Sequence, residues 1–189
     1  MIGDERLRII ERDKLLRKIQ EWKAKAGKEE DPFDKYLSLF IAYNILYNLY
    51  KKTNDSNANL ARGDSTRAVE VQLLADPDIL LRTLESELKS YVGFIPIYRE
   101  EFWDGNVPIR ETLVGALDAK NSAKTLDMLL KWLYKVRCNI VHGEKNYDDS
   151  RQKELLEQSS SMLEKILVHL VDSYDRKYVS GPEKRLFSE

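Results

Sequence analysis

The sequence is poor in the residues that build metal sites and disulfides. It has one cysteine and two histidines in 189 residues. A single cysteine cannot form an intrachain disulfide, and these three residues show no zinc-ligand spacing. No apolar run approaches the roughly 18 residues that cross a bilayer, and the first residues lack an apolar signal region. We therefore expect a cytoplasmic protein with no metal and no membrane contact.

An excess of charge of one sign is also missing. The chain carries 31 basic and 32 acidic residues, a net charge of -1. This balance excludes a general polyanion binder, so any contact with RNA must use a local cleft and be sensitive to salt. The sequence also lacks a phosphate-binding glycine loop, a dinucleotide fingerprint and the nucleophile elbow of serine hydrolases. These absences predict a protein without a cofactor.

The sequence has only 8 glycines and 5 prolines, and 42% of it is hydrophobic. Apolar residues recur at helical spacing, which predicts an all-α, up-down helical bundle. The expected helices span about 4–26, 31–52, 66–75, 76–93, 122–143 and 149–177, with a short one at 110–118 in an otherwise irregular region, 98–120. We expect an N-terminal helical extension (1–30), a bundle (31–178) with a mobile loop at about 53–65, and a flexible tail (179–189).

An arginine occupies an apolar position in the helix expected at 122–143. At about 100° per residue, the stripe centred on Arg137 contains Leu126, Leu130, Leu133, Tyr134, Ile140 and Val141. A guanidinium stays charged and is costly to bury without partners. Arg137 is therefore interpreted either as a functional cation or as the partner of a buried acid on another helix.

His142 closes the same helix, because Gly143 follows it and favours a left-handed helix end. A helix C-terminus favours the imidazolium form, whereas a nearby arginine opposes it, so the group can titrate near neutral pH. On an ideal helix His142 points about 140° away from Arg137. A shared site requires either an unwound helix end or a second copy of the chain. The alternative is a simple C-terminal cap.

Three further residues are weaker candidates for contacts with RNA or phosphate. Asn44 is a polar residue in the most apolar helix, and its alternative interpretation is a satisfied buried amide. Asn139 and Lys145 lie close to the motif, and their alternative is a solvated surface position. His169 lies among apolar residues of the last helix and is interpreted as a packing residue.

The segment Arg137-Cys-Asn-Ile-Val-His142 resembles the arginine, four residues, histidine motif of HEPN domains (higher eukaryotes and prokaryotes nucleotide-binding). The resemblance extends to residues 134–145 and 40–47, and covers roughly 31–175 with a divergent middle. It implies an all-helical bundle that acts as a metal-independent endoribonuclease. It also implies a homodimer in which two motifs form one cleft.

Two positions depart from the pattern of the family. Many of its nucleases carry Asn or Asp directly after the arginine, where this chain has Cys138. A subset carries a tyrosine two residues past the histidine, a target for regulatory nucleotide transfer, where this chain has Glu144. The first departure affects which side chain orients the phosphate, and the second gives no support to that regulation.

The expected activity is cleavage of RNA by its own 2′-hydroxyl, with Arg137 and His142 from both subunits as the catalytic residues. The resemblance implies a setting in toxin–antitoxin modules or anti-phage defence, with an inhibitory antitoxin or other regulatory partner. The alternative function is a non-catalytic module that binds a nucleotide, RNA or a partner protein.

Overall fold

The computed structural model describes residues 2–55, 63–95, 100–102, 105–142 and 149–180. Apart from one short pair of strands, the regular elements of this part are helices, which confirms the all-helical prediction. The elements are α1 (Ile2–Ala26), α2 (Pro32–Asn54), α3 (Asp64–Glu70), η1 (Val71–Leu74), α4 (Pro77–Tyr91), η2 (Val92–Phe94), β1 (Glu100–Phe102), β2 (Gly105–Val107), α5 (Ile109–Asp118), α6 (Ser122–Val141) and α7 (Ser150–Tyr178).

Side-chain caps fix where the main helices begin. The Asp31 carboxylate accepts hydrogen bonds from the backbone N–H groups of Phe33 and Asp34, and Pro32 takes the first helical position of α2. Asp76 and Asp149 cap α4 and α7 in the same way, and Asn121 caps α6. Because a cap needs only a few neighbouring residues, these starting points were predictable from sequence.

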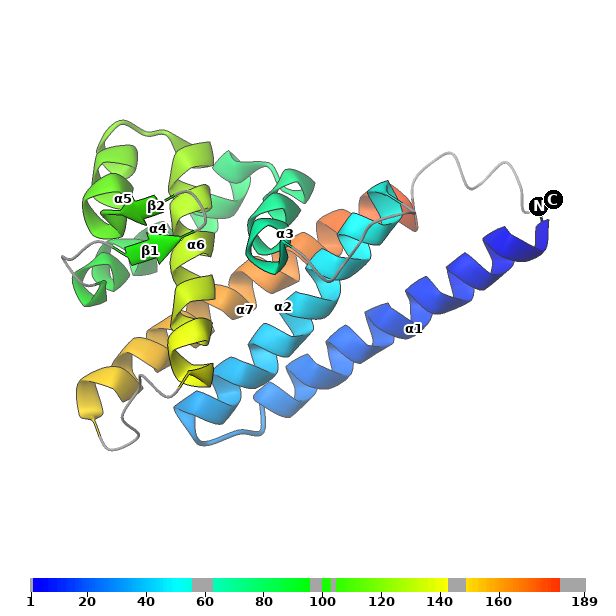
Figure 1. The fold of residues 1–189 in the computed structure, drawn as a ribbon, viewed down its shortest axis with the longest axis horizontal. Coiled ribbons are helices and arrows are strands. Elements are labelled where there is room, and N and C mark those ends of the chain that lie inside the picture. Colours follow the sequence, from blue (N-terminus) through cyan, green and yellow to red (C-terminus); the bar gives the residue numbers. More distant parts are fainter. Residues whose placement is uncertain (1, 56–62, 96–99, 103–104, 143–148, 181–189) are drawn as a thin grey trace.

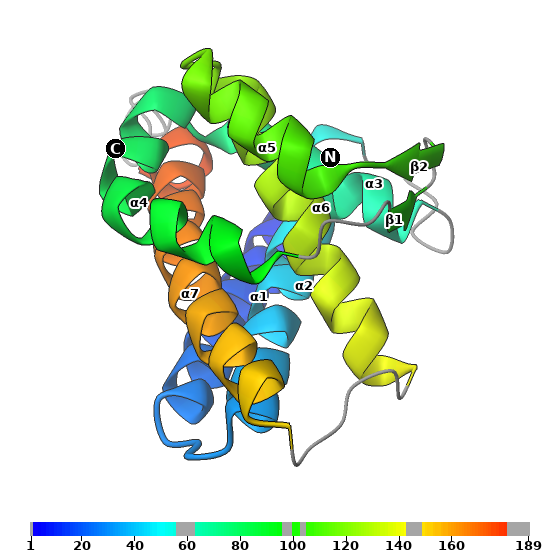
Figure 2. The same ribbon diagram turned by 90° about the vertical axis from the view of Figure 1, so that its left-hand side faces the viewer.

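Three helices form a layer, and α6 packs across it. Helices α1 and α7 both contact α2, and the three run obliquely across the view of Figure 1 with α2 between α1 and α7. Helix α6 crosses this layer and contacts α2, α3, α4 and α5 (Figures 1 and 2). The middle of α6, from Thr125 to Leu133, is buried apart from Asp127, whereas Val141 and His142 at its C-terminal end are exposed.

The core is rich in buried tyrosines whose hydroxyl groups are hydrogen-bonded. Tyr91 bonds to Ser159 at 2.7 Å, and Tyr174 bonds to Thr53 at 2.7 Å. Trp132 of α6 is fully buried. These two pairs link α4 to α7 and α2 to α7, and each satisfies the hydroxyl groups of both its members.

Some boundaries differ from the prediction. Helix α2 continues through Thr53 to Asn54 and α3 begins at Asp64, so the loop expected at 53–65 is shorter. Most of that loop (56–62) and the tail from 181 lie outside the described residues. The region expected to be irregular holds an antiparallel pair, β1 and β2, with Glu101 opposite Asn106. Strands of three residues are too short to show an alternating pattern.

Helix α1 packs along α2 and buries Ile19 and Ala26. The division into an extension (1–30) and a bundle (31–178) stays a prediction. In the described part of the chain, no helix is long and apolar enough to cross a membrane.

Candidate functional site at the C-terminal end of α6

The apolar stripe of α6 runs from the core to the surface. Leu126, Leu130 and Leu133 are fully buried, or nearly so. One turn later Arg137 is only half-buried, and beyond it Val141 is 54% exposed. Arg137 therefore lies where the stripe emerges from the bundle. Its guanidinium can reach solvent, or a ligand, from an apolar surrounding.

Arg137 contacts aromatic and sulfur groups. Its Cζ lies 5.9 Å from the centre of the Phe40 ring of α2, and Nη1 lies 4.0 Å from Sγ of Cys138. Among the residues that the structure describes, no carboxylate forms an ion pair with Arg137. The alternative interpretation, a structural pair with a buried acid, therefore finds no support in this part of the chain.

Tyr36 of α2 holds the helical turn that carries Arg137. Its buried hydroxyl donates a hydrogen bond to the backbone carbonyl of Leu133, with an Oη–O distance of 2.5 Å. In an α-helix the same carbonyl accepts from the N–H group four residues later, which is that of Arg137. Burial raises the pKa of Tyr36 well above its usual value, and the charge of Arg137 opposes this rise. Tyr36 therefore remains a neutral donor.

His142 is the C-cap of α6 and is exposed. Its φ is -86° and ψ is 5°, and its backbone N–H donates to the carbonyl of Cys138 at 2.9 Å. The helix does not unwind before this residue, so the imidazole starts about 140° around the helix from Arg137. The two residues share the end of α6 but do not form one site within a single chain. The described residues contain no cluster of His, Cys, Asp or Glu that could hold a metal.

The weaker candidates are placed as follows. Asn44 is half-buried, and its amide oxygen accepts a hydrogen bond from Nδ2 of Asn48 at 3.1 Å. Asn139 is only 6% exposed and lies about 160° around α6 from Arg137, so it is neither a surface residue nor close to that side chain. Lys145 lies outside the described residues.

A closed ring of hydrogen bonds, which was not predicted from the sequence, joins α2 to α3. Arg67 donates from Nε to Asn48 at 2.8 Å and from Nη2 to Asp64 at 3.1 Å. Asn48 donates to Asn44, Asn44 donates to the hydroxyl of Tyr47, and this hydroxyl donates to Asp64 at 2.8 Å. Arg67 is 5% exposed, so the buried arginine with an acidic partner is Arg67 rather than Arg137.

This ring, which we call the Asp64 ring, is connected to α6. The hydroxyl of Tyr134 donates to Oδ2 of Asp64 at 3.2 Å. The Tyr134 ring packs edge-to-face against Phe40, with centroids 6.0 Å apart and planes at 60°. Phe40 is also the ring beneath Arg137. Polar residues spaced three and four apart in 44–48 and 64–67 were the available signal, but the sequence does not show that their helices meet.

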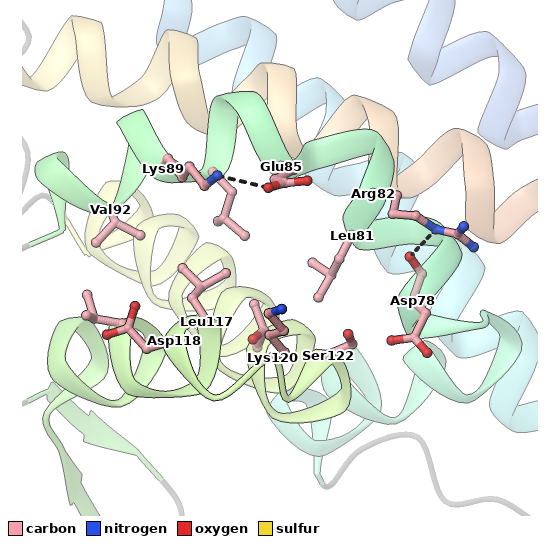
Figure 3. Close-up of a pocket in the computed structure, with 13 residues that line it drawn as sticks. Asp78, Leu81, Arg82, Glu85, Lys89, Val92, Leu117, Asp118, Lys120 and Ser122 are labelled. Carbon is pink, nitrogen blue, oxygen red and sulfur yellow. Dashed lines mark hydrogen bonds and ion pairs between the residues drawn. The ribbon is translucent and has the colours of Figure 1, made fainter.

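One groove of the described structure lies away from Arg137. It has a volume of about 850 Å³ and lies between α4, α5 and the start of α6. Figure 3 shows Glu85 and Lys89 of α4 across the groove from Asp118 and Lys120. The first residue of α6 on its rim, Ser122, is about 22 Å along the helix from Arg137. This groove therefore belongs to a different surface.

His169 lines a second hollow, beside Asp76, Asp172 and Arg176. Burial, then the charge of Arg176, lowers its pKa below the ordinary value, while Asp172 and Asp76 act in the opposite direction. The folded state therefore binds fewer protons than the unfolded state, whose histidine titrates near about 6.5. The contribution of His169 to stability is complete above that pH and is lost as the pH falls through the folded pKa.

We expect urea unfolding between pH 5 and 7.5 to show this dependence. The stability of the wild-type protein relative to His169→Gln should fall as the pH decreases below about 6.5. If the stability of the wild-type protein relative to His169→Gln does not change with pH, or rises as the pH falls, the lowered pKa of His169 is wrong.

Comparisons with known proteins add nothing to the resemblance to HEPN domains. No model of a known protein family matches the chain, and neither a curated protein nor a solved structure matches it.

Proposed function

We propose that this chain is a HEPN-type, metal-independent endoribonuclease, built on the up-down bundle of that family and acting as a homodimer. The observation that carries the proposal is the position of Arg137. It is a half-buried cation over Phe40, and no carboxylate pairs with it in the described part of the chain. A cation held in this way can bind the phosphodiester, because a guanidinium forks to two phosphate oxygens.

The reaction needs a base, an acid and a cation. A base removes the proton of the RNA 2′-hydroxyl, whose oxygen attacks the neighbouring phosphorus. Arg137 stabilises the added charge on the phosphorane oxygens, and an acid protonates the 5′-oxygen as the P–O bond breaks. One chain supplies one arginine and one histidine. Two chains supply His142 twice, which provides both the base and the acid.

The geometry of one chain favours the dimer over a single-chain site. His142 and Arg137 leave α6 in directions about 140° apart, so a partner copy has to bring its His142 to this Arg137. Val141 lies one turn beyond Arg137 on the same face and is 54% exposed. This valine offers an apolar contact for the partner copy.

A charge at this position should weaken the dimer. We expect Val141→Asp to shift the protein toward monomer in light scattering coupled to size exclusion, because the carboxylate would lose its hydration in the interface. Val168→Asp is the matched control, since Val168 is 40% exposed on α7. If Val141→Asp and Val168→Asp both stay dimeric, the proposed interface is wrong.

Cys138 occupies the place where many HEPN nucleases have a polar residue. Its Sγ is within 4.0 Å of Nη1 of Arg137 and is a weak acceptor. Phosphate orientation in this chain then rests mainly on the guanidinium. Because the net charge is -1, the chain as a whole does not attract RNA. We therefore expect a modest affinity that falls as the salt concentration rises.

The family supplies the biological setting by analogy. A nuclease that cuts cellular RNA requires restraint, so we propose a cytoplasmic toxin or anti-phage protein with an inhibitory antitoxin as its partner.

The activity can be tested with purified protein and a labelled single-stranded RNA in EDTA. The proposal predicts cleavage that persists in the chelator and leaves a 2′,3′-cyclic phosphate on one product and a 5′-hydroxyl on the other. Cleavage that requires added Mg²⁺, or products with 5′-phosphates, would contradict the 2′-hydroxyl mechanism.

The second candidate is a non-catalytic module that binds a nucleotide, RNA or a partner protein. The groove between α4 and α5 favours it, because this hollow of about 850 Å³ has apolar and charged walls and is remote from Arg137. Binding of RNA or nucleotide without any cleavage, unchanged in Arg137→Ala, would favour this function over the nuclease.

A further inference from the structure

Three helices meet at the carboxylate of Asp64. One oxygen accepts hydrogen bonds from Tyr47 of α2 and from Arg67 of its own helix, α3. The other oxygen accepts from Tyr134 of α6. A carboxylate is only an acceptor, and here both of its oxygens have donors. Its position is therefore defined from three directions.

The donors to Asp64 do not lose their protons at ordinary pH. Burial raises the pKa of the Tyr47 hydroxyl, and the neighbouring Asp64 raises it further. Burial likewise raises the pKa of Tyr134, and Cys138 and Asp64 add to this rise while Arg137 opposes it. Both tyrosines therefore keep their protons and can donate near neutral pH.

The other members of the Asp64 ring hold the carboxylate in place. Arg67 is buried, and it is tied to Asn48 as well as to Asp64. Asn48 in turn bonds to Asn44. Because the ring is closed, Asp64 cannot turn away from Tyr134 without breaking hydrogen bonds elsewhere in it.

Tyr134 connects this ring to the cation of the site. It lies one helical turn before Arg137, and its ring packs edge-to-face on Phe40 at 6.0 Å. Arg137 lies over the same Phe40 ring at 5.9 Å. A Tyr134 side chain released from Asp64 could change rotamer, and Phe40 would then lose one of the contacts that define the surface beneath the guanidinium.

We propose that Asp64 and Tyr134 are positioning residues for Arg137: their hydrogen bond fixes the aromatic surface on which the guanidinium lies. The effect of this hydrogen bond on catalysis rests on the function proposed above. A guanidinium that is already oriented stabilises the transition state without reorganising during the reaction. Neither Asp64 nor Tyr134 has to touch the RNA.

The variant Tyr134→Phe tests this idea, because it keeps the aromatic ring and removes only the hydroxyl. Tyr174→Phe is the matched control. It also loses one interhelical hydroxyl contact, to Thr53 at 2.7 Å, at the far end of α2. We expect kcat for RNA cleavage to fall about tenfold in Tyr134→Phe, with KM nearly unchanged, and to stay within about twofold in Tyr174→Phe. Equal effects of the two variants would mean that the Tyr134 hydroxyl is only structural.

A second readout does not depend on cleavage. The guanidinium Nε–Hε signal of Arg137 in NMR reports its place over Phe40, and the reaction of Cys138 with a disulfide reagent reports access to the same face. We expect both to change in Tyr134→Phe and in Asp64→Asn, and neither to change in Tyr174→Phe. If neither changes in the first two variants, the positioning role is wrong even when the protein cuts RNA. If both change but the wild-type protein cuts no RNA, the nuclease proposal fails and the positioning role stands.

Discussion

Replacing Arg137 with alanine is expected to slow RNA cleavage by about 100- to 1000-fold, the range found when one preorganised transition-state donor is removed. The variant should keep its helical content and stability, because Arg137 is half-buried and forms no ion pair among the described residues. The measurement is single-turnover cleavage of a labelled RNA in EDTA, with circular dichroism as the check on folding.

Two further variants sharpen this result. Arg82→Ala removes the same charge from an exposed position on α4, beside the remote groove, and should cleave at the wild-type rate. Arg137→Lys keeps the charge but loses the planar fork, so we expect a rate between those of the wild type and Arg137→Ala. If Arg137→Ala cleaves as fast as Arg82→Ala, the guanidinium has no part in the reaction.

Replacing Arg67 with methionine is expected to lower the free energy of unfolding by about 2–4 kcal/mol. The change keeps the bulk of a 5%-exposed side chain but removes the donors to Asn48 and Asp64. The side chain of Asp64 is 37% exposed, so water can solvate part of the abandoned carboxylate. We therefore expect the loss toward the lower end of this range.

Urea unfolding gives this value directly, with Arg82→Met as the control. Because Arg82 is exposed, its replacement should change stability by no more than about 0.5 kcal/mol. A loss below about 1 kcal/mol in Arg67→Met would show that the Asp64 ring contributes little to stability. It would also weaken the argument that the ring fixes Asp64 in place.

The helices could be predicted where local chemistry decides them. Asp31 with Pro32, Asp76 with Pro77, and Asn121 all begin helices where capping rules place them. The pair β1 and β2 was not predicted, because three-residue strands leave no periodic pattern. Its pairing depends on contacts that a local pattern does not encode.

The site could be predicted in part. The helical wheel marks Arg137 as an unusual residue of the stripe, but it cannot tell where the stripe leaves the core. Asn139 is 6% exposed, and its burial depends on tertiary packing, which the helical wheel does not show. The burial of Arg67 was not predicted, because Asp64 and Arg67 are three residues apart in the sequence. Such a pair resembles an ordinary ion pair on the surface of a helix. Only the packing of α3 on α2 buries Arg67, while Asp64 stays partly exposed.

RNA cleavage in EDTA by His142→Ala and Arg137→Ala, measured beside the wild-type protein, decides whether these two residues form the catalytic pair. We expect the wild type to cut single-stranded RNA in EDTA and both variants to fold, to dimerise and to lose this cleavage. Wild-type rates in either variant would contradict the assignment of Arg137 and His142 as the catalytic pair.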